Sequence, residues 1–217
     1  MIQFDVITIF PDIFDNYFNT SIIKRAKAKG LIKIKIHNLR DFALGRHKSV
    51  DDRPYGGGPG MILRADVLLR ALKKTSKNKP SEKIILTSAA GKQFDQKTAY
   101  RYAKLKRIIF ICGRYEGVDA RIEKFIDEKV SVGPYVLTGG ELPVMTMIDA
   151  VTRLIPGVIK EESLKEETFT SSAAEYAQYT RPEILTFRQK NGKIKTLKVP
   201  KILLSGHHKN IKDWRNK

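Results

Sequence analysis

The sequence predicts an α/β protein with a mostly parallel sheet, followed by a small, mostly helical basic domain. Short apolar segments alternate with amphipathic segments of helical length along residues 1–154, which is typical of a parallel sheet covered by helices on both faces. The alternation stops at Pro156, and the residues beyond it are charged and short of apolar anchors. We therefore expect a first domain over residues 1–160, a mobile linker over 161–170 and a C-terminal domain over 171–217.

Five strands are expected in the first domain. They lie at residues 2–9, 31–37, 83–87, 107–112 and 129–132. Segment 31–37 alternates isoleucine with lysine, so we expect one of its faces to meet solvent. Segment 107–112 carries an apolar run without alternation, so we expect it to be buried on both faces.

Five helices are expected between and after these strands, because apolar residues recur there at helical spacing. They lie at residues 14–29, 65–74, 95–103, 119–126 and 141–154. Gly30 ends the first of them. Residues 40–60 are too polar and too rich in glycine and proline to form a regular element.

The C-terminal domain is expected to contain a β-hairpin and a basic helix. Residues 184–188 and 194–199 flank Asn191-Gly192, the dipeptide preferred in a tight type I′ turn. Residues 206–217 follow as a small basic helix that carries Trp214, the one tryptophan of the chain.

The chain carries a large positive charge. Its 41 Lys and Arg stand against 23 Asp and Glu, which gives a net charge of +18 at pH 7. Eleven of these cations lie between Arg181 and Lys217, where only Glu183 and Asp213 oppose them. A basic excess attracts polyanions, and charge concentrated at one end of the chain predicts a nucleic-acid partner.

Several functional classes lack support in the sequence. The longest apolar run, 108–112, is far shorter than the ~18 residues that a membrane span needs. The N-terminus lacks the pattern of a secretion signal, and no phosphate loop, dinucleotide fingerprint or H-E-x-x-H metal motif occurs. The single cysteine, Cys112, predicts a buried and inert thiol in a reducing cytosol. We therefore expect a cytoplasmic protein with neither a membrane partner nor a metal site.

Three glycine-rich loops are the strongest functional signal. Residues 51–61 contain four glycines and two prolines, which lets the backbone approach a ligand or partner closely. Residues 111–117 and 131–143 each place glycine and charge just after an expected strand, where α/β sheets bind ligands. We expect the last two loops to form the walls of one pocket.

Six strings of residues follow one another over almost the whole chain and resemble a single family. They are RPYGGGPGM at 53–61, CGRYEG at 112–117, YVLTGGELP at 135–143, RLIPG at 153–157, YTRP at 179–182 and LSGHH at 204–208. These strings are similar to those of TrmD, the bacterial tRNA (guanine-N1)-methyltransferase family of the SPOUT superfamily.

The resemblance implies a SPOUT-type sheet with a deep trefoil knot, an obligate homodimer and a C-terminal domain that grips tRNA. It also implies methyl transfer from S-adenosylmethionine to N1 of the guanine next to the anticodon, at tRNA position 37. The pattern of elements alone would not have suggested a knot, because knotted chains are rare.

Carried over position by position, the resemblance implies ten residues that bind S-adenosylmethionine. They are Leu86, Gly113, Tyr115, Val132, Gly133, Tyr135, Val136, Leu137, Gly139 and Gly140. Adenine needs an apolar slot with backbone donors and acceptors, which Val136 and Leu137 in a glycine-flanked loop can supply.

Two residues are expected to act on the guanine. Arg153 matches a family arginine that meets O6, where a guanidinium stabilises the charge that develops as N1 loses its proton. Glu167 stands where the family has an aspartate that removes this proton. Glu162 or Glu166 could take that role if the linker shifts register.

Four further residues within the matched strings are expected to contact RNA, namely Gly58, Arg114, Arg181 and His207. The sequence leaves open whether Mg²⁺ activates the reaction. If it does, it would act near Glu116, although no spacing in the chain demands a metal.

The chain departs from the family at several places. Pro134 replaces an acidic residue, Glu167 replaces aspartate, residues 175–178 differ from the usual string, and the hairpin around Asn191-Gly192 looks like an insertion. One alternative is therefore a catalytically impaired RNA-binding protein that keeps the fold. Another is a knotted methyltransferase acting on rRNA or on a ribose 2′-hydroxyl, against which the loop at 53–61 and the Tyr-Thr-Arg-Pro string argue.

Overall fold

The computed structural model describes residues 1–160 and 176–215, which belong to two compact units, Met1–Lys160 and Glu161–Lys217. The expected linker at 161–170 lies outside the described residues. Within the described parts of the chain, no helix is both long enough and apolar enough to cross a membrane.

The first unit is built on a five-stranded sheet with the strand order β2-β1-β6-β5-β7. Its strands are β1 (Ile2–Thr8), β2 (Ile32–Asn38), β5 (Glu82–Gln93), β6 (Arg107–Ile111) and β7 (Glu128–Ser131). Every pairing in this sheet is parallel, which confirms the prediction of an α/β fold with a parallel sheet. β6 lies at the centre with residues 108–111 buried, as its uninterrupted apolar run predicted.

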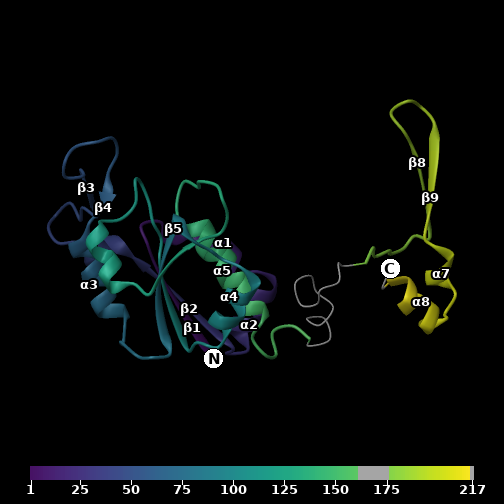
Figure 1. Cartoon of the computed structure of the whole chain (residues 1–217), viewed down its shortest axis with the longest axis horizontal. Coiled ribbons are helices and arrows are strands. Elements are labelled where there is room, and N and C mark those ends of the chain that lie inside the picture. The colour runs from purple at the N-terminus through teal and green to yellow at the C-terminus, as the bar shows by residue number, and fades with distance from the viewer. Residues whose placement is uncertain (161–175, 216–217) are drawn as a thin grey trace. The chain divides into compact units, whose positions relative to one another are not determined.

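Helices cover both faces of this sheet (Figure 1). α2 (Ser21–Ala28), α4 (Gln96–Ala103) and α5 (Glu141–Arg153) share one apolar core with the strand residues Phe4 and Phe110. α3 (Ala65–Thr75) covers the other face, in a second core. Successive strand residues point to opposite faces, and the three inner strands β1, β6 and β5 contribute to both cores.

Two expected helices take a different form. The helix expected over residues 14–29 is divided into η1 (Pro11–Phe14), α1 (Asp15–Phe18) and α2, because Thr20 is extended and Ser21 has a positive φ of 44°. The helix expected over 119–126 is instead a 3₁₀ helix, η3 (Ala120–Phe125), whose start is capped by the Asp119 carboxylate.

The sheet and the polar stretch at 40–60 also contain elements that the sequence did not predict. β5 continues to Gln93 and pairs again with β7 after a register shift between Thr87 and Lys92. A Cβ at Gly91 would lie 2.7 Å from the Lys129 carbonyl carbon, so glycine permits this second pairing. The polar stretch contains η2 (Leu39–Phe42) and β3 (Asp51–Asp52), which pairs with β4 (Ile62–Leu63).

The second unit contains an antiparallel hairpin and two short helices. These are β8 (Ile184–Arg188), β9 (Ile194–Lys198), α7 (Lys201–Leu204) and α8 (His208–Arg215). The expected hairpin and basic helix are confirmed, and α7 is an addition. The described residues divide between ribbon and helix, whereas we expected a mostly helical domain.

The hairpin turn is not the expected type I′ turn. A type I′ turn needs a positive φ at both central residues, but Gly192 alone has one, at 81°. Gly192 N donates to Gln189 O over 2.9 Å, and Gln189 N donates to Lys193 O over 2.7 Å. This is a three-residue loop that ends in a glycine bulge.

The central strand gives a test of the core. Phe110 is fully buried in β6, and its ring stacks on Phe4 with 6.5 Å between centroids. We expect Phe110→Ala to lower the free energy of unfolding by about 3–5 kcal/mol, because a large cavity remains. Phe125→Ala, at a side chain that is 50% exposed, is the control and should change it by less than ~1 kcal/mol. Equal denaturant midpoints for the two variants would contradict this core.

Candidate active site

The loops that follow β6 and β7 converge at the carboxyl ends of these strands. Arg114 and Gly139 form an antiparallel bridge, and Gly140 N donates a hydrogen bond to Gly113 O over 2.8 Å. The prediction that these two glycine-bearing loops form one site is therefore confirmed. Their position agrees with the general location of ligand sites in parallel α/β sheets.

Glycine is required where these loops meet. A Cβ at Gly140 would collide with Thr87 Oγ1 and lie 2.7 Å from Gly113 N. A Cβ at Gly139 would collide with the side chain of Arg114, and one at Gly113 would lie 2.8 Å from Thr87 O. The close approach of three chain segments thus depends on the missing side chains.

A cleft of about 460 Å³ opens between these loops and β5. It is lined by nine of the ten residues expected to bind the methyl donor: Leu86, Gly113, Tyr115, Val132, Tyr135, Val136, Leu137, Gly139 and Gly140. Gly133 does not line it, because the ring of Tyr135 lies against Gly133. Sequence reasoning missed Ser88, Ala89 and Ala90, which line the cleft from the unpredicted part of β5.

Apolar side chains around the cleft are left uncovered by the protein. Val136 is 85% exposed, and Tyr115, Tyr135 and Leu137 are also exposed. Tyr115 adopts a positive φ of 57°, a conformation that costs energy for a bulky residue and clusters at functional sites. A ligand with a flat apolar part would cover this surface.

A buried ion pair holds the two loops against α5. Glu141, in the first turn of α5, is 1% exposed and accepts a hydrogen bond from Arg114 Nε over 2.9 Å. Thr8 Oγ1, at the end of β1, donates to the other carboxylate oxygen over 2.8 Å. Arg114 Nη1 also donates to Thr138 O over 3.1 Å, and its guanidinium lies 4.6 Å from the Phe10 ring centroid. Arg114, which we expected to contact RNA, is thus engaged within the protein.

The thiol of Cys112 lies beneath the cleft loops and is 2% exposed. Burial raises its pKa well above the usual value, and the nearby Glu141 carboxylate adds to this effect. The prediction of a buried thiol is confirmed, and the raised pKa supports the prediction that it is inert.

The third glycine-rich loop is joined to the cleft at its base. Glu116 N donates to Met61 O, and Leu63 N donates to Gly117 O, each over 3.0 Å. Gly58, which we expected to contact RNA, has a φ of 119° and lies in the exposed part of this loop, where Tyr55 is 99% exposed.

Of the remaining expected site residues, Arg153 alone can be placed relative to this cleft. α5 begins at the cleft and ends at Arg153, so a rise of 1.5 Å per residue places Arg153 about 18 Å along the helix from Glu141. Glu167, with its alternatives Glu162 and Glu166, lies outside the described residues. Arg181 and His207 belong to the second unit.

The described residues contain no group of three or more His, Cys, Asp or Glu side chains that could hold a metal ion. Glu116, near which Mg²⁺ was considered, is exposed and lines the cleft.

The fold and the cleft define an α/β protein with a candidate small-ligand site at the carboxyl ends of a parallel sheet. The family profile described as tRNA (Guanine-1)-methyltransferase TrmD matches residues 2–217, and the chain belongs to this family. The membership expected from the six strings is therefore confirmed.

Curated relatives agree over the full length of the chain. It is 47% identical over 218 residues to the tRNA (guanine-N(1)-)-methyltransferase of Dictyoglomus turgidum, and 46% identical over 216 residues to that of Syntrophomonas wolfei. It is 47% identical over 214 residues to the enzyme of the same name from Clostridium novyi. These matches cover 98–100% of this chain and 84% of each relative.

The close approach at Gly140 gives a test of the cleft. We expect Gly140→Ala to weaken binding of S-adenosylmethionine by about 10- to 100-fold, because the new methyl group forces the loops apart. Titration calorimetry measures this. The matched control is Gly30→Ala, which adds a methyl group where no atom lies within 4 Å. Its positive φ of 68° should lower the free energy of unfolding by about 1 kcal/mol but leave donor affinity unchanged. Tight donor binding by Gly140→Ala would mean that the donor lies elsewhere.

Proposed function

We propose that the chain transfers a methyl group from S-adenosylmethionine to N1 of the guanine at position 37, next to the tRNA anticodon. The observation that carries this proposal is the cleft, in which two glycine-bearing loops and β5 assemble nine of the ten expected donor-binding residues. The membership in the tRNA (guanine-1)-methyltransferase family supports the reaction. A tRNA substrate would also place the enzyme in the cytoplasm.

The residues of the cleft suit this donor. Its volume of about 460 Å³ lies within the range of ~300–1,000 Å³ of ligand sites. The exposed side chains of Val136 and Leu137 offer apolar surface for the adenine, beside the glycines that line the cleft. S-adenosylmethionine supplies an activated methyl group on a sulfonium, so the protein has to align the reactants and exclude water.

We also propose that the crossing of the two cleft loops is part of a trefoil knot. The support is local: Gly140 lies against Gly113 and Thr87, so segments from β5, β6 and the start of α5 pass within contact distance. Such close crossings are what a deeply knotted chain requires.

Proton removal from N1 is assigned to Glu167. A carboxylate with an ordinary pKa near ~4 is a weak base toward guanine, so it needs an oxyanion stabiliser. We assign that role to Arg153, whose guanidinium would stabilise negative charge on O6. Mg²⁺, if it activates the reaction, would act near Glu116 in the cleft wall.

A homodimer explains how Arg153 can act about 18 Å from the cleft of its own chain. Leu142, which is 54% exposed, lies in the first turn of the helix that Arg153 ends. Thr146 is exposed and Asp149 half-buried, and the spacing of these residues puts them on one stripe with Arg153. Exposed Ile13 adds apolar surface from η1, which contacts α5.

A twofold contact along this stripe would be the same on both subunits. If the two α5 helices run in opposite directions, the end that carries Arg153 meets the end at which the partner's cleft begins. We therefore propose that each active site combines one subunit's cleft with the partner subunit's Arg153.

The second unit, Glu161–Lys217, is proposed to bind tRNA. Arg181, His207 and the excess of cations after Arg181 supply the positive charge for phosphate contacts. The first unit would then contribute the donor site and Gly58.

A labelled-methyl assay tests the function. With S-adenosylmethionine and a tRNA that has guanine after the anticodon, we expect the wild-type chain to produce 1-methylguanine. Glu167→Ala should lower turnover at least ~100-fold, because general-base catalysis is lost, while donor affinity stays nearly unchanged.

Glu162→Ala and Glu166→Ala are the matched controls and should retain turnover. Wild-type rates in Glu167→Ala would assign the base to another residue. Tight tRNA binding without methyl transfer by the wild-type chain would instead favour the catalytically impaired RNA-binding protein.

Mixing two impaired variants tests the shared site. Arg153→Ala and Gly140→Ala should each have low activity as homodimers at a donor concentration below the wild-type dissociation constant. After subunit exchange, a 1:1 mixture should recover about a quarter of the wild-type activity, because about half of its dimers are heterodimers and one of the two sites in each combines an intact cleft with an intact arginine. No recovery, with exchange verified by differently tagged subunits, would show that Arg153 does not act across the interface.

A further inference from the structure

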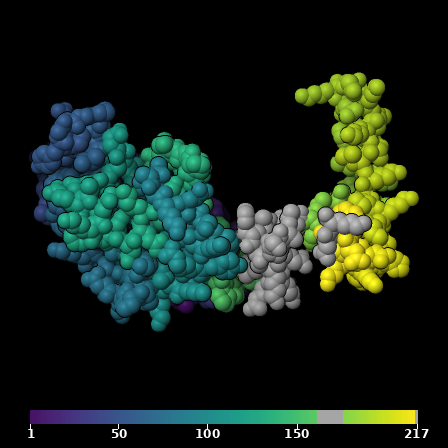
Figure 2. Space-filling model, in the orientation of Figure 1, coloured from purple at the N-terminus to yellow at the C-terminus, as the bar shows by residue number. Residues whose placement is uncertain are grey.

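The hairpin of β8 and β9 buries almost nothing within the described part of the second unit. Every side chain of both strands is exposed, so neither face of the ribbon is covered. Figure 2 shows the ribbon projecting from the helices of its own unit. An isolated two-stranded hairpin is only marginally stable in water. Each strand of this ribbon has five residues, and none of them packs into a core. Core packing therefore does not explain which side chains the ribbon carries.

The ribbon is held by its own backbone and turn. The strands pair in register from Ile184–Lys198 to Arg188–Ile194, and the turn adds two backbone hydrogen bonds between Gln189 and its partners. Thr186 and Thr196 lie opposite each other with their hydroxyl oxygens 3.3 Å apart. The remaining side chains are therefore available for a partner.

The charge of the ribbon has a single sign. Residues 184–199 contain five cations and no acidic residue: Arg188, Lys190, Lys193, Lys195 and Lys198. All five are exposed. This charge is complementary to a polyphosphate backbone.

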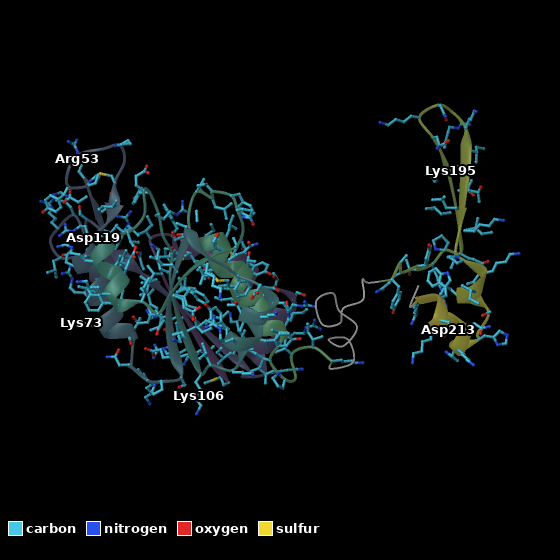
Figure 3. All side chains as sticks on the ribbon, in the orientation of Figure 1. Arg53, Lys73, Lys106, Asp119, Lys195 and Asp213 are labelled. Carbon is cyan, nitrogen blue, oxygen red and sulfur yellow. The ribbon has the colours of Figure 1, made fainter. Side chains whose placement is uncertain are left out.

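Apolar and cationic side chains alternate across the ribbon. The register pairs Phe187 with Lys195 on the same face as Leu185 and Leu197, and Phe187 is 42% exposed. Figure 3 shows side chains, including the labelled Lys195, projecting from both sides of the ribbon. An exposed aromatic ring beside cations is the arrangement that binds unpaired nucleotides, by stacking on the base and contacting the phosphate.

We propose that the β8–β9 ribbon is an RNA-binding arm that contacts the tRNA substrate. Its cations bind backbone phosphates, and Phe187 stacks on an unstacked base. This inference rests on the proposed function, since the occupant is the same tRNA. The narrow major groove of A-form RNA does not admit side chains readily, so the arm binds a loop or the phosphate backbone.

Neutralising the ribbon tests the arm. The variant replaces all five ribbon cations by glutamine, and its dissociation constant for tRNA is measured as a function of salt. We expect binding at least ten-fold weaker at physiological salt, and a log–log salt slope reduced by about 0.7 for each phosphate that the ribbon no longer neutralises. Donor affinity should stay as in the wild type, which confirms that the first unit is folded.

The matched control removes the same charge from the first unit. It replaces five exposed lysines of that unit by glutamine: Lys24, Lys33, Lys97, Lys104 and Lys106. Its salt slope should change less than that of the ribbon variant. Equal changes in the two variants would overturn the arm, because net charge alone would explain them.

Phe187→Ala tests stacking separately from charge. We expect about ten-fold weaker tRNA binding with an unchanged salt slope, since this variant keeps every cation of the ribbon. Ile194→Ala, at a side chain that is 68% exposed on the other face, is the control and should bind as the wild type does.

A measurement on the wild-type chain avoids variants altogether. Bound tRNA should protect Lys195 and Lys198 from an amine-reactive acetylating reagent, relative to the free protein. Full reactivity of both lysines in the complex, with unchanged tRNA affinity of the ribbon variant, would overturn the proposal.

If that variant instead lost self-association at unchanged tRNA affinity, the ribbon would be an interface between copies of the chain. If the wild-type chain binds tRNA through the ribbon but transfers no methyl group, the proposed function fails and the arm stands.

Discussion

A carboxylate buried at the start of a helix needs a compensating group, and in this chain Arg114 compensates Glu141. The positive end of the α5 dipole and the Thr8 hydroxyl stabilise the same charge. Because Arg114 belongs to the loop after β6, its ion pair with Glu141 fixes that loop against α5. The carbonyl of Thr138 accepts from the same guanidinium, so the loop after β7 is fixed too. The shape of the cleft follows from this one cluster.

Much of the first unit could be predicted, because its elements are encoded by local periodicity. The buried centre of β6 and the cap of α4 at Asp95 follow from residues next to them in the chain. The errors lie where distant contacts decide the backbone. β5 extends past Thr87 because Gly91 lets it pass close to β7, and no local pattern marks that pairing. The hairpin turn differs because the loop spans three residues, and Asn191 therefore avoids a positive φ.

The site could be predicted in part. The glycine loops and the resemblance together indicated which residues line the cleft, because motif residues of the two loops share one edge of the sheet. The engagement of Arg114 could not be foreseen, since Thr8 and Glu141 are 133 positions apart. The distance from Arg153 to the cleft depends on which end of α5 faces the ligand, and this becomes visible only once the helix is placed on the sheet.

Cys112 gives the chain an internal reporter. Its thiol is 2% exposed and belongs to the core that includes α5, so a thiol reagent can reach it only after this part of the protein opens. The rate of labelling would then measure how often the site opens, without any introduced probe. A bound donor that holds the loops together would slow this rate in proportion to its occupancy. The one cysteine thus allows local opening of the site to be measured in the unmodified protein.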